Sequence, residues 1–413
     1  MCEGMILDCV EALVQGCVFC WAVDLINNME HQDPNREFFF KNLFPIVKEH
    51  AEMYDWPEIT EADVEPVYMK ALSNMTYKVK CKIPGTQPIL AKYFGQGYLD
   101  SLLDRNIDND VSSTFGELDI GPKVYYCSDK CRIEQFVFST EFTNEDMQDD
   151  SKRKLLSYYM TNLHKSSIPS IPKGSLLSRC QTATFPLIDL ARQSAEQKKD
   201  LFDDKEKQIV EDVLSLAGQD ELAFLKNITS EFENDLVVSH NDFLNGNILN
   251  LPTGELKLID FEYTSYNIKM FDIANFINES LFNYALDQFP YFEYNGNMRD
   301  EDSRVREMIK YYALFSKESK NVDFERANEL IDNEKAADAE LVRLYGSLDS
   351  AEAEIDRLMK QLHASYLLSH AIWILWAIVM CKNDNIQFGY IEFAKQRYED
   401  YLMLKSKYYG ENN

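Results

Sequence analysis

A short apolar run in this chain ends in three polar side chains whose types and spacing could carry out chemistry. Val237 to Ser239 lead directly into His240 and Asp242, and Asn247 follows five residues after that aspartate. A strand that ends in a polar loop can hold an Asp at a fixed point while an Asn five residues later projects back into the same space. Such a pair can orient a hydroxyl group beside a metal-bound phosphate. We predict that Asp242 and Asn247 are catalytic and that His240 supports their loop through hydrogen bonds.

A second apolar run supplies further oxygen ligands. Residues 256–259 are followed by Asp260-Phe261-Glu262. An Asp at the tip of a buried strand suits Mg²⁺, which prefers carboxylate and phosphate oxygens together. Each of these residues alone could be an ordinary strand-end or turn residue. In combination they predict a magnesium site formed by Asn247, Asp260 and Glu262, with Asp260 also counted as catalytic.

The surrounding sequence predicts two regions of different structure. Apolar runs bounded by turn residues predict an antiparallel sheet before residue 138, with strands at 64–72, 76–81, 88–93, 123–127 and 133–137. A helix is expected between the third and fourth of these strands, at 99–118. Beyond about 140 the pattern is mainly helical, with two more short strands at 236–239 and 256–261. We therefore predict an α+β fold with a small antiparallel-sheet lobe at 1–137 and a larger, mainly helical lobe at 138–413.

Two rows of apolar residues repeat every seven positions late in the chain. The rows are Leu341, Leu348, Ile355 and Leu362, and Leu344, Ala351 and Leu358. Three heptads could form a coiled-coil contact between two copies of the chain or a helix pair within one copy. The small number of heptads favours the helix pair.

Composition narrows the range of partners. The 413 residues are 45% hydrophobic, which is enough for a large core, and 69 acidic against 42 basic side chains give a net charge of -27. An acidic surface repels phosphate polyanions, so we expect no nucleic-acid partner. Residues 10–26 are apolar but interrupted by charged and polar residues, and no stable membrane insertion is expected. Nine scattered cysteines predict a reducing, cytoplasmic compartment, and the lone Cys17 and Cys20 pair predicts buried thiols.

Two segments resemble a known family over almost their whole length. "SHNDFLNGNIL" and "LKLIDFEYTSYNIKMFDIAN" resemble the signature blocks of the choline/ethanolamine kinase family, and "GPKVYY" and "CRIEQFV" resemble its last sheet strands and hinge. The similarity runs in patches from about 69 to 405. It implies a protein-kinase-like bilobal fold and a homodimer. It also implies Mg²⁺-dependent transfer of the γ-phosphoryl group of ATP to the hydroxyl of choline, with Asp242 orienting that hydroxyl.

The resemblance also implies which residues meet the nucleotide. Lys92 occupies the strand position that faces the phosphates, and Gln135 and Val137 belong to the hinge that meets adenine. The loop over the phosphates would contain Leu72, Ser73, Asn74 and Met75. This loop lacks the two glycines that the family usually has, so its backbone has less freedom to approach a phosphate. The carboxylate that pairs with Lys92 is left open between Asp108 and Asp110.

A quaternary ammonium group binds best over aromatic faces, and the sequence offers several. Trp373 and Trp376 are three apart and share one face of a helix, which by spacing alone also fits a core stripe. The resemblance implies a choline cage made of Glu279, Tyr284, Trp373, Trp376, Phe388 and Phe393. Phe393 stands where choline-specific members often have Tyr. The two Trp nevertheless favour choline over ethanolamine.

Other functions remain open at this level. An ethanolamine kinase or a kinase for both amino alcohols would share nearly all of these residues. An aminoglycoside-type kinase would share the Asp242, Asn247 and Asp260 pattern. A catalytically silent choline-binding or scaffold protein is the alternative of another class.

Overall fold

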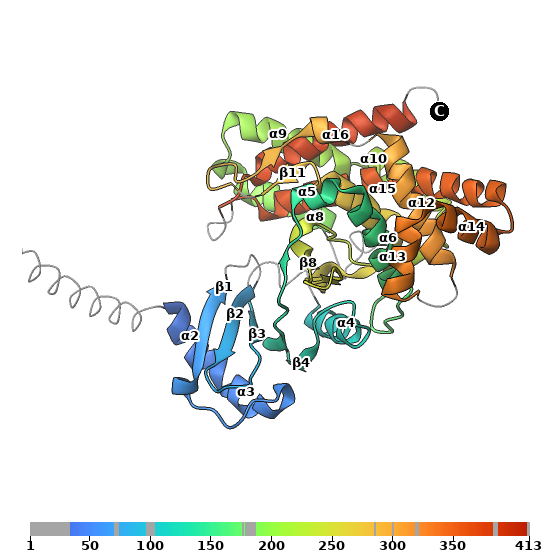
Figure 1. Cartoon of the computed structure of the whole chain (residues 1–413). Helices are drawn as coiled ribbons and strands as arrows, with labels where there is room; N and C mark the ends of the chain where they lie inside the picture. Colours follow the sequence, from blue (N-terminus) through green and yellow to red (C-terminus); the bar gives the residue numbers. More distant parts are fainter. Residues whose placement is uncertain are drawn as a thin grey trace, which may run out of the picture. The chain divides into compact units, whose positions relative to one another are not determined.

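The chain forms two contact units in the computed structural model (Figure 1). The smaller unit combines Met1–Gln96 with Val124–Phe136, and the larger unit combines Gly97–Lys123 with Val137–Asn413. The structure describes residues 34–69, 74–95, 104–175, 177, 187–284, 286–299, 301–318, 322–382 and 387–410. The apolar stretch at 10–26 and the Cys17 and Cys20 pair lie outside these residues.

The smaller unit contains an antiparallel sheet with strand order β1-β2-β3-β5-β4. The strands are β1 (Val64–Met69), β2 (Asn74–Cys81), β3 (Ile89–Phe94), β4 (Val124–Cys127) and β5 (Cys131–Gln135). β3 pairs with β5 in a register that places Lys92 opposite Arg132 and Leu90 opposite Glu134. The five strands predicted from apolar runs are therefore confirmed, with shifts at their ends.

Alternating burial explains why one face of this sheet is covered. In β2, Tyr77 and Val79 are buried. Lys78 between them is only partly buried, and Lys80 after them is exposed. Phe39 and Val47 pack with these side chains in one core. The helical segments that contribute to this core are α2 (Pro34–Asn42), α3 (Phe44–Glu49) and η1 (Ala51–Tyr54), and η2 (Glu61–Asp63) leads into β1.

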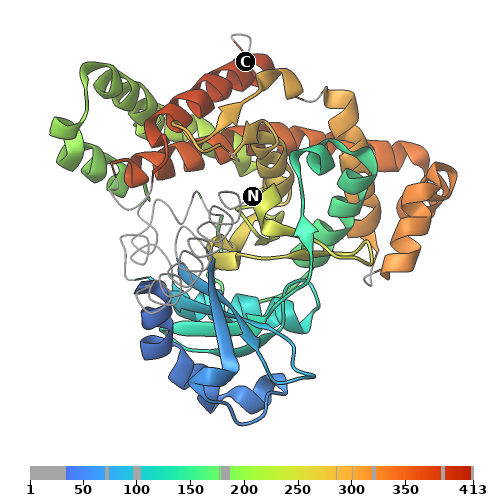
Figure 2. The same ribbon diagram turned by 60° about the vertical axis from the view of Figure 1, so that its left-hand side comes forward.

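The larger unit is mainly helical. Its α-helices in the described residues are α4 (Arg105–Glu117), α5 (Asn144–Gln148), α6 (Asp150–His164), α8 (Leu187–Lys198), α9 (Asp204–Leu214), α10 (Gln219–Ser230), α11 (Phe271–Glu279), α12 (Asp302–Lys317), α13 (Phe324–Asp332), α14 (Glu334–Tyr345), α15 (Leu348–Met380) and α16 (Tyr390–Tyr409). Its short 3₁₀ turns are η4 (Lys199–Leu201), η5 (Ser215–Ala217), η6 (Asn245–Asn247), η7 (Phe261–Tyr263) and η8 (Gly296–Met298). Figure 2 shows α16 lying along α15, and α11 also packs on α15.

Short strands hold the polar segments singled out by the sequence. They are β6 (Thr140–Glu141), β7 (Leu236–Ser239), β8 (Ile248–Asn250), β9 (Leu256–Leu258), β10 (Ser265–Ile268), β11 (Phe282–Asn283) and β12 (Glu293–Tyr294). β7 pairs with β10, and β9 pairs with β8, which also pairs with β6. The strand predicted at 256–261 is shorter than expected and corresponds to β9. It ends at Leu258 because Asp260 has a left-handed backbone, with φ of 66°, and Phe261 begins η7.

The heptad rows pack inside the larger unit. The chain turns at Gly346, whose φ of 83° ends α14 before α15 begins. Leu341, Ile355 and Leu362 are buried, whereas Leu348 at the turn is exposed. The intramolecular helix pair is therefore confirmed.

Helix α15 is also long and apolar enough to cross a membrane by length and composition. In the apolar window of this helix, 89% of the residues are buried inside the fold. This burial is what a central core helix requires, and it adds no support for a membrane span.

Helix α4 falls in the larger unit although it precedes β4 and β5 in sequence. Phe115 of α4 contacts Phe261 with 4.7 Å between ring centroids. Gly121 lies so close to the same ring that an added Cβ would stand 2.8 Å from it. The last crossing between the units lies after Phe136, one residue before the predicted division, and 97–123 groups with the helical part. The two lobes as functional domains stay a prediction.

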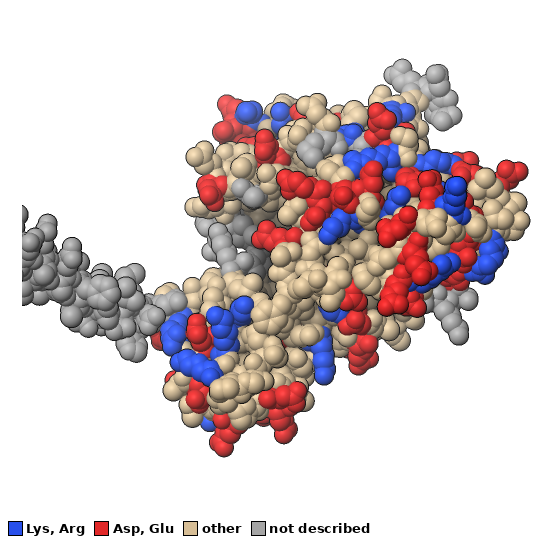
Figure 3. All heavy atoms as spheres, viewed as in Figure 1, with Lys and Arg blue, Asp and Glu red and all other residues tan. Residues whose placement is uncertain are grey.

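The surface of α12, α14 and α15 is covered by ion pairs. Arg306 contacts Glu352 and Asp356, and Lys310 contacts Glu334 and Asp338. Acidic and basic side chains alternate over this region of the larger unit in Figure 3. The acidic residues of this segment thus form a solvated face on which charges are paired.

Candidate active site

The segment after β7 is fixed by the side chain of His240. His240 is fully buried, and its Nε2 lies 2.9 Å from the backbone oxygen of Ile259, while its Nδ1 accepts the backbone N–H of Asp242 at 3.3 Å. Burial lowers the pKa of His240, so the ring is neutral with the proton on Nε2. The imidazole therefore joins the loop that carries Asp242 to the strand end that carries Asp260. The predicted supporting role of His240 is confirmed.

Asp242 and Asn247 meet directly. The Nδ2 atom of Asn247 donates to Oδ2 of Asp242 and to its backbone oxygen, each at 2.9 Å. Asn247 is nearly buried in η6. Both bonds use the amide nitrogen, so the Oδ1 atom of Asn247 is the atom available to a cation.

Asp260 enters the same site from the end of the second apolar run. The backbone N–H of Ile259 donates to the backbone oxygen of Asn247 at 3.0 Å, which brings the two segments together. Asp260 is close enough to raise the pKa values of both Asp242 and Glu262 by charge repulsion. The structure thus brings the predicted residues 242, 247, 260 and 262 into one site in the larger unit.

Glu262 has a partner that the sequence did not reveal. Its Oε2 lies 3.5 Å from Nη1 of Arg105, and the same nitrogen lies 3.4 Å from Oδ2 of Asp108. Arg105 and Asp108 belong to the first turn of α4. Asp108, which the sequence suggested as a partner of Lys92, therefore lies in a charged cluster with Arg105 and Glu262.

The partly buried carboxylates of Asp242 and Glu262 are protonated more readily than usual. Burial, followed by the charge of Asp260, raises the pKa of Asp242 to about 7. Burial, followed by the charges of Asp260 and Asp108, raises the pKa of Glu262 to about 8. Crowded acidic groups of this kind gain most from a bound cation, because the cation cancels their mutual repulsion.

A divalent metal fits this donor set only together with phosphate oxygens. In the part of the chain that the structure describes, no three His, Cys, Asp or Glu side chains form a metal site by themselves. Mg²⁺ is commonly bound by one or two carboxylates plus substrate phosphates. The amide of Asn247 and the carboxylates of Asp260 and Glu262 match that kind of site.

The residues expected around the nucleotide lie mostly in the smaller unit. Nζ of Lys92 lies 3.3 Å from Oε2 of Glu134, and Arg132 also pairs with Glu134. Burial opposes ionisation of Glu134, but the charges of Lys92 and Arg132 outweigh it and lower its pKa. Glu134 is thus a partner of Lys92 inside this unit, where the sequence analysis had proposed Asp108 or Asp110.

The other expected nucleotide residues are placed individually. Asn74 and Met75 begin β2, and the partly buried Met75 packs against the core. Gln135 is exposed at the end of β5. Val137, two residues later, is the residue at which the chain enters the larger unit again. Leu72 and Ser73 lie outside the described residues. Their contact with a nucleotide stays a prediction.

The expected cage residues lie in one aromatic cluster of the larger unit. Ring centroids are 5.4 Å apart for Trp373 and Trp376, and 5.7 Å for Phe388 and Phe393. Tyr284 lies 6.2 Å from Phe388 and 6.5 Å from Phe393. Tyr390 connects the two groups, at 5.7 Å from Trp376 and 4.9 Å from Phe388. All six expected positions except Glu279 are therefore linked through ring contacts.

Glu279 joins this cluster through both of its carboxylate oxygens. The hydroxyl of Tyr284 donates to Oε2 at 2.6 Å, and Arg397 forms an ion pair with Oε1. The guanidinium of Arg397 also lies over two rings, 4.7 Å from the centroid of Phe393 and 5.2 Å from that of Phe282. Burial lowers the pKa of Arg397 to about 9, so it remains a cation at neutral pH.

Sequence reasoning missed several residues of this site. Arg397 follows Phe393 by four positions on α16, and this helical spacing could have placed both on one face. Tyr263 accepts the Nε1–H of Trp376 at 2.9 Å, which links the segment of Asp260 to the aromatic cluster. No spacing rule connects Arg105 with Glu262, because they are brought together only by packing of α4 on η7.

Comparison with solved structures confirms the fold class. The choline kinase from Cryptosporidium parvum Iowa II gives a TM-score of 0.65 at 21% identity and covers 89% of this chain and 96% of that one. The Plasmodium vivax ethanolamine kinase gives a TM-score of 0.61 at 18% identity and covers 90% and 96%. At these identities the likeness establishes the fold alone. The protein has the predicted protein-kinase-like α+β fold, with a small antiparallel-sheet part and a larger helical part.

Sequence comparison then identifies the family. The profile described as Choline/ethanolamine kinase matches residues 66–402. Mouse choline kinase alpha is 27% identical over 309 residues, which cover 73% of this chain and 61% of that protein. Human choline/ethanolamine kinase is 24% identical over 351 residues, which cover 81% of this chain and 78% of that protein. The chain belongs to the choline/ethanolamine kinase family, and with that family it is an ATP-dependent phosphotransferase.

Proposed function

We propose that this protein is a choline kinase, which transfers the γ-phosphoryl group of MgATP to the hydroxyl of choline and gives phosphocholine and ADP. This is the first step of phosphatidylcholine synthesis. The observation that supports the proposal most is the meeting of Asp242, Asn247 and Asp260 in one partly buried, acidic site. Phosphoryl transfer requires mainly positioning and charge neutralisation, and these three side chains can supply both.

Asp242 is proposed to act on the hydroxyl of the substrate. Its Oδ2 is oriented by the amide of Asn247 at 2.9 Å, so its other oxygen can accept a hydrogen bond from an alcohol. A pKa of about 7 suits a group that takes up a proton near neutral pH. When the proton leaves the hydroxyl, Asp242 holds it while the oxygen attacks the γ-phosphorus.

The metal is proposed to be Mg²⁺, held by Asn247, Asp260 and Glu262 together with phosphate oxygens of ATP. The bound metal would neutralise charge on the transferred phosphoryl group. Lys92, Gln135, Val137 and residues 72–75 are proposed to contact the nucleotide, as the family resemblance implies. The resting ion pair of Lys92 with Glu134 would keep its ammonium oriented.

The choice of choline rests on how Glu279 is already bound. Both of its oxygens already have protein partners, Tyr284 and Arg397, and the ion pair with Arg397 offsets its negative charge, so it attracts a primary ammonium less than a free carboxylate would. A trimethylammonium group needs apolar and π surface instead, which Trp373, Trp376 and the neighbouring rings supply. An ethanolamine kinase or a dual kinase remains the alternative, since Phe393 lacks the hydroxyl that a Tyr would offer.

A direct test measures ADP release with MgATP and either choline or ethanolamine. The wild type is compared with Asp242→Ala and with Asp204→Ala, which removes an exposed aspartate of α9. We expect turnover with choline to exceed turnover with ethanolamine, and Asp242→Ala to abolish both while nucleotide still binds. Asp204→Ala should match the wild type. A folded wild type that releases no ADP with either amino alcohol would favour the silent scaffold or choline-binding protein.

The assembly and the compartment stay proposals from the sequence. A homodimer and a cytoplasmic location are properties that the family resemblance and the cysteine content suggest. Sedimentation of the purified chain would decide the first, and imaging of a tagged chain in its own cells the second.

A further inference from the structure

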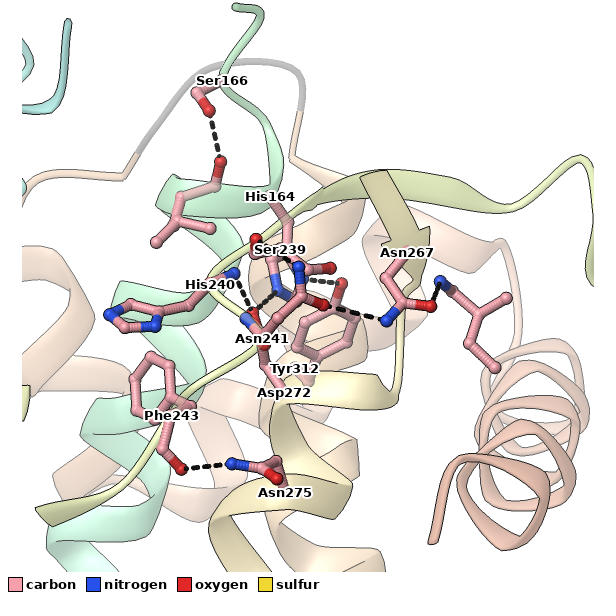
Figure 4. A network of polar contacts seen from close by, with 12 residues as sticks. His164, Ser166, Ser239, His240, Asn241, Phe243, Asn267, Asp272, Asn275 and Tyr312 are labelled. Atoms are coloured by element: carbon pink, nitrogen blue, oxygen red, sulfur yellow. Dashed lines mark hydrogen bonds and ion pairs between the residues drawn. The ribbon is translucent and has the colours of Figure 1, made fainter. Parts of the chain in front are cut away.

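The backbone on both sides of Asp242 is held by one face of α11. The carboxylate of Asp272 accepts the N–H of His240 at Oδ2 and the N–H of Asn241 at Oδ1, each at 2.8 Å. One helical turn later, Nδ2 of Asn275 donates to the backbone oxygen of Phe243 at 3.3 Å. Figure 4 shows these two side chains of α11 pointing toward the segment from His240 to Phe243. Three of the four residues of that segment are therefore bound to α11, and Asp242 is the one between them.

Asn241 is held from the other side as well. Its backbone has a left-handed φ of 69°, which is uncommon outside glycine although Asn adopts it more readily than most residues. Its Nδ2 donates to the backbone oxygen of Tyr263 at 2.9 Å, and its Oδ1 accepts from Asn267 at 2.9 Å. The unusual backbone turn that points Asp242 into the site is thus imposed by side-chain hydrogen bonds. Asp272 supplies the bonds to the backbone N–H groups.

Asp272 is itself fixed by His164, the last residue of α6. Nε2 of His164 lies 2.9 Å from Oδ2 of Asp272, and Nδ1 lies 2.7 Å from the hydroxyl of Tyr312 on α12. Both His164 and Asp272 are almost completely buried. A carboxylate can only accept, so Nε2 of His164 carries a proton, and Nδ1 shares a second hydrogen bond with the hydroxyl of Tyr312. Burial opposes ionisation of Asp272, but the hydrogen bond from His164 helps to lower its pKa, which keeps it an anion.

We infer that His164 is a positioning residue for phosphoryl transfer. Acting through Asp272, it fixes the backbone of His240 and Asn241 and thereby the carboxylate of Asp242. The inference rests on the proposed role of Asp242. His164 lies on α6, outside the group formed by Asp242, Asn247 and Asp260, so its loss should affect the turnover number more than substrate affinity.

Two substitutions at this position separate the hydrogen bond from the ring. In His164→Gln the side-chain amide nitrogen reaches about as far as Nε2 and can still donate to Asp272. In His164→Asn the amide is too short to reach it. A matched control is His363→Asn, which removes another mostly buried imidazole that stacks on Tyr408 with 3.7 Å between ring centroids.

The experiment measures kcat, KM for choline and ATP, thermal stability, and hydrogen exchange of the peptide that contains residues 237–248. We expect His164→Asn to lower kcat about tenfold or more with KM within about twofold, and His164→Gln to stay within about threefold of the wild type. The amides of His240 and Asn241 should exchange about tenfold faster or more in His164→Asn and near the wild-type rate in His164→Gln. His363→Asn should lower thermal stability and leave kcat, KM and the exchange of these amides unchanged.

The result that overturns the inference is a folded His164→Asn protein with wild-type kcat and wild-type exchange at these amides, or equal losses in the Asn and Gln variants. If His164→Asn does not fold, Tyr312→Phe replaces it, because it removes only the hydroxyl at Nδ1. Unchanged kcat and exchange in Tyr312→Phe would then overturn the inference. Exchange is read without substrate, so failure of the inference is distinguished from failure of the proposed function, in which the wild type itself releases no ADP.

Discussion

The buried ion pair between Arg397 and Glu279 gives a quantitative prediction. Arg397 is fully buried and Glu279 is 4% exposed, so water cannot compensate either charge if its partner is removed. Replacing Arg397 by Met keeps an apolar side chain of similar length against the rings of Phe282 and Phe393 but leaves Glu279 as an unpaired anion. Removal of one partner of a buried pair costs about 3–5 kcal/mol. We expect this loss in the free energy of unfolding of Arg397→Met.

The double variant isolates the interaction. In Arg397→Met with Glu279→Gln no charge is left unpaired at this point, and the Gln oxygen can still accept from the hydroxyl of Tyr284. Asp400, which also feels the charge of Arg397, keeps its ion pair with Arg299 at 2.8 Å. Neutral replacement of a buried pair often has no net cost. The free energy of unfolding of the double variant should therefore be about 2 kcal/mol or more higher than that of the single variant.

The assay is equilibrium unfolding in urea, followed by tryptophan fluorescence, to which Trp373 and Trp376 of the same aromatic cluster contribute. Circular dichroism on the same samples checks that both signals report one transition. A loss below about 1 kcal/mol in the single variant would refute the reasoning. So would a double variant that is no more stable than the single one, because Glu279 would then not be the group that Arg397 compensates.

Three further predictions concern the polar site and the cage. The pKa of Asp242 is raised from its ordinary value of 3.8 to about 7, so ionising this carboxyl opposes folding as the pH rises through that range. Without metal and nucleotide, Asp242→Asn should therefore be more stable than the wild type at pH 8. In thermal unfolding this difference should shrink toward pH 5. Asp260→Asn should lower kcat by about 10²-fold or more and weaken the effect of Mg²⁺ on nucleotide binding by calorimetry, and normal turnover would remove Asp260 from the site. Tyr284→Phe frees Oε2 of Glu279 while keeping the ring, so kcat/KM for ethanolamine relative to choline should rise several-fold, and an unchanged ratio would show that this hydroxyl does not set the preference.

The sequence predicted the parts of the fold that follow local rules. Each sheet strand of the smaller unit was recognisable because its apolar run is bounded by turn residues such as those around Gly85. The Asp242 and Asn247 pair was predictable because five residues of loop after a strand leave few ways to place the two side chains. The end of β9 was missed because Asp260 takes a left-handed backbone, which apolar patterning does not encode.

Contacts between distant segments could not be predicted in the same way. Arg105 and Glu262, or His164 and Asp272, are separated by more than 100 residues and meet only through helix packing. The partner of Lys92 was sought on a helix, whereas Glu134 on the neighbouring strand of its own sheet lies 3.3 Å away. Sequence spacing carries no information on such meetings, since they depend on how whole elements are arranged.

The placement of α4 in the helical unit restricts how this protein can be divided into pieces. A fragment that stops at residue 96 would lack β5, the strand that hydrogen-bonds to β3. The backbone N–H and C=O groups of β3 would then form a bare edge open to pairing with other molecules, and such edges promote aggregation. A sheet fragment that folds by itself would need residues 124–136 joined to residue 96 by a short linker in place of 97–123. The helical fragment would need residues 97–123, which contain α4, joined in turn to residue 137.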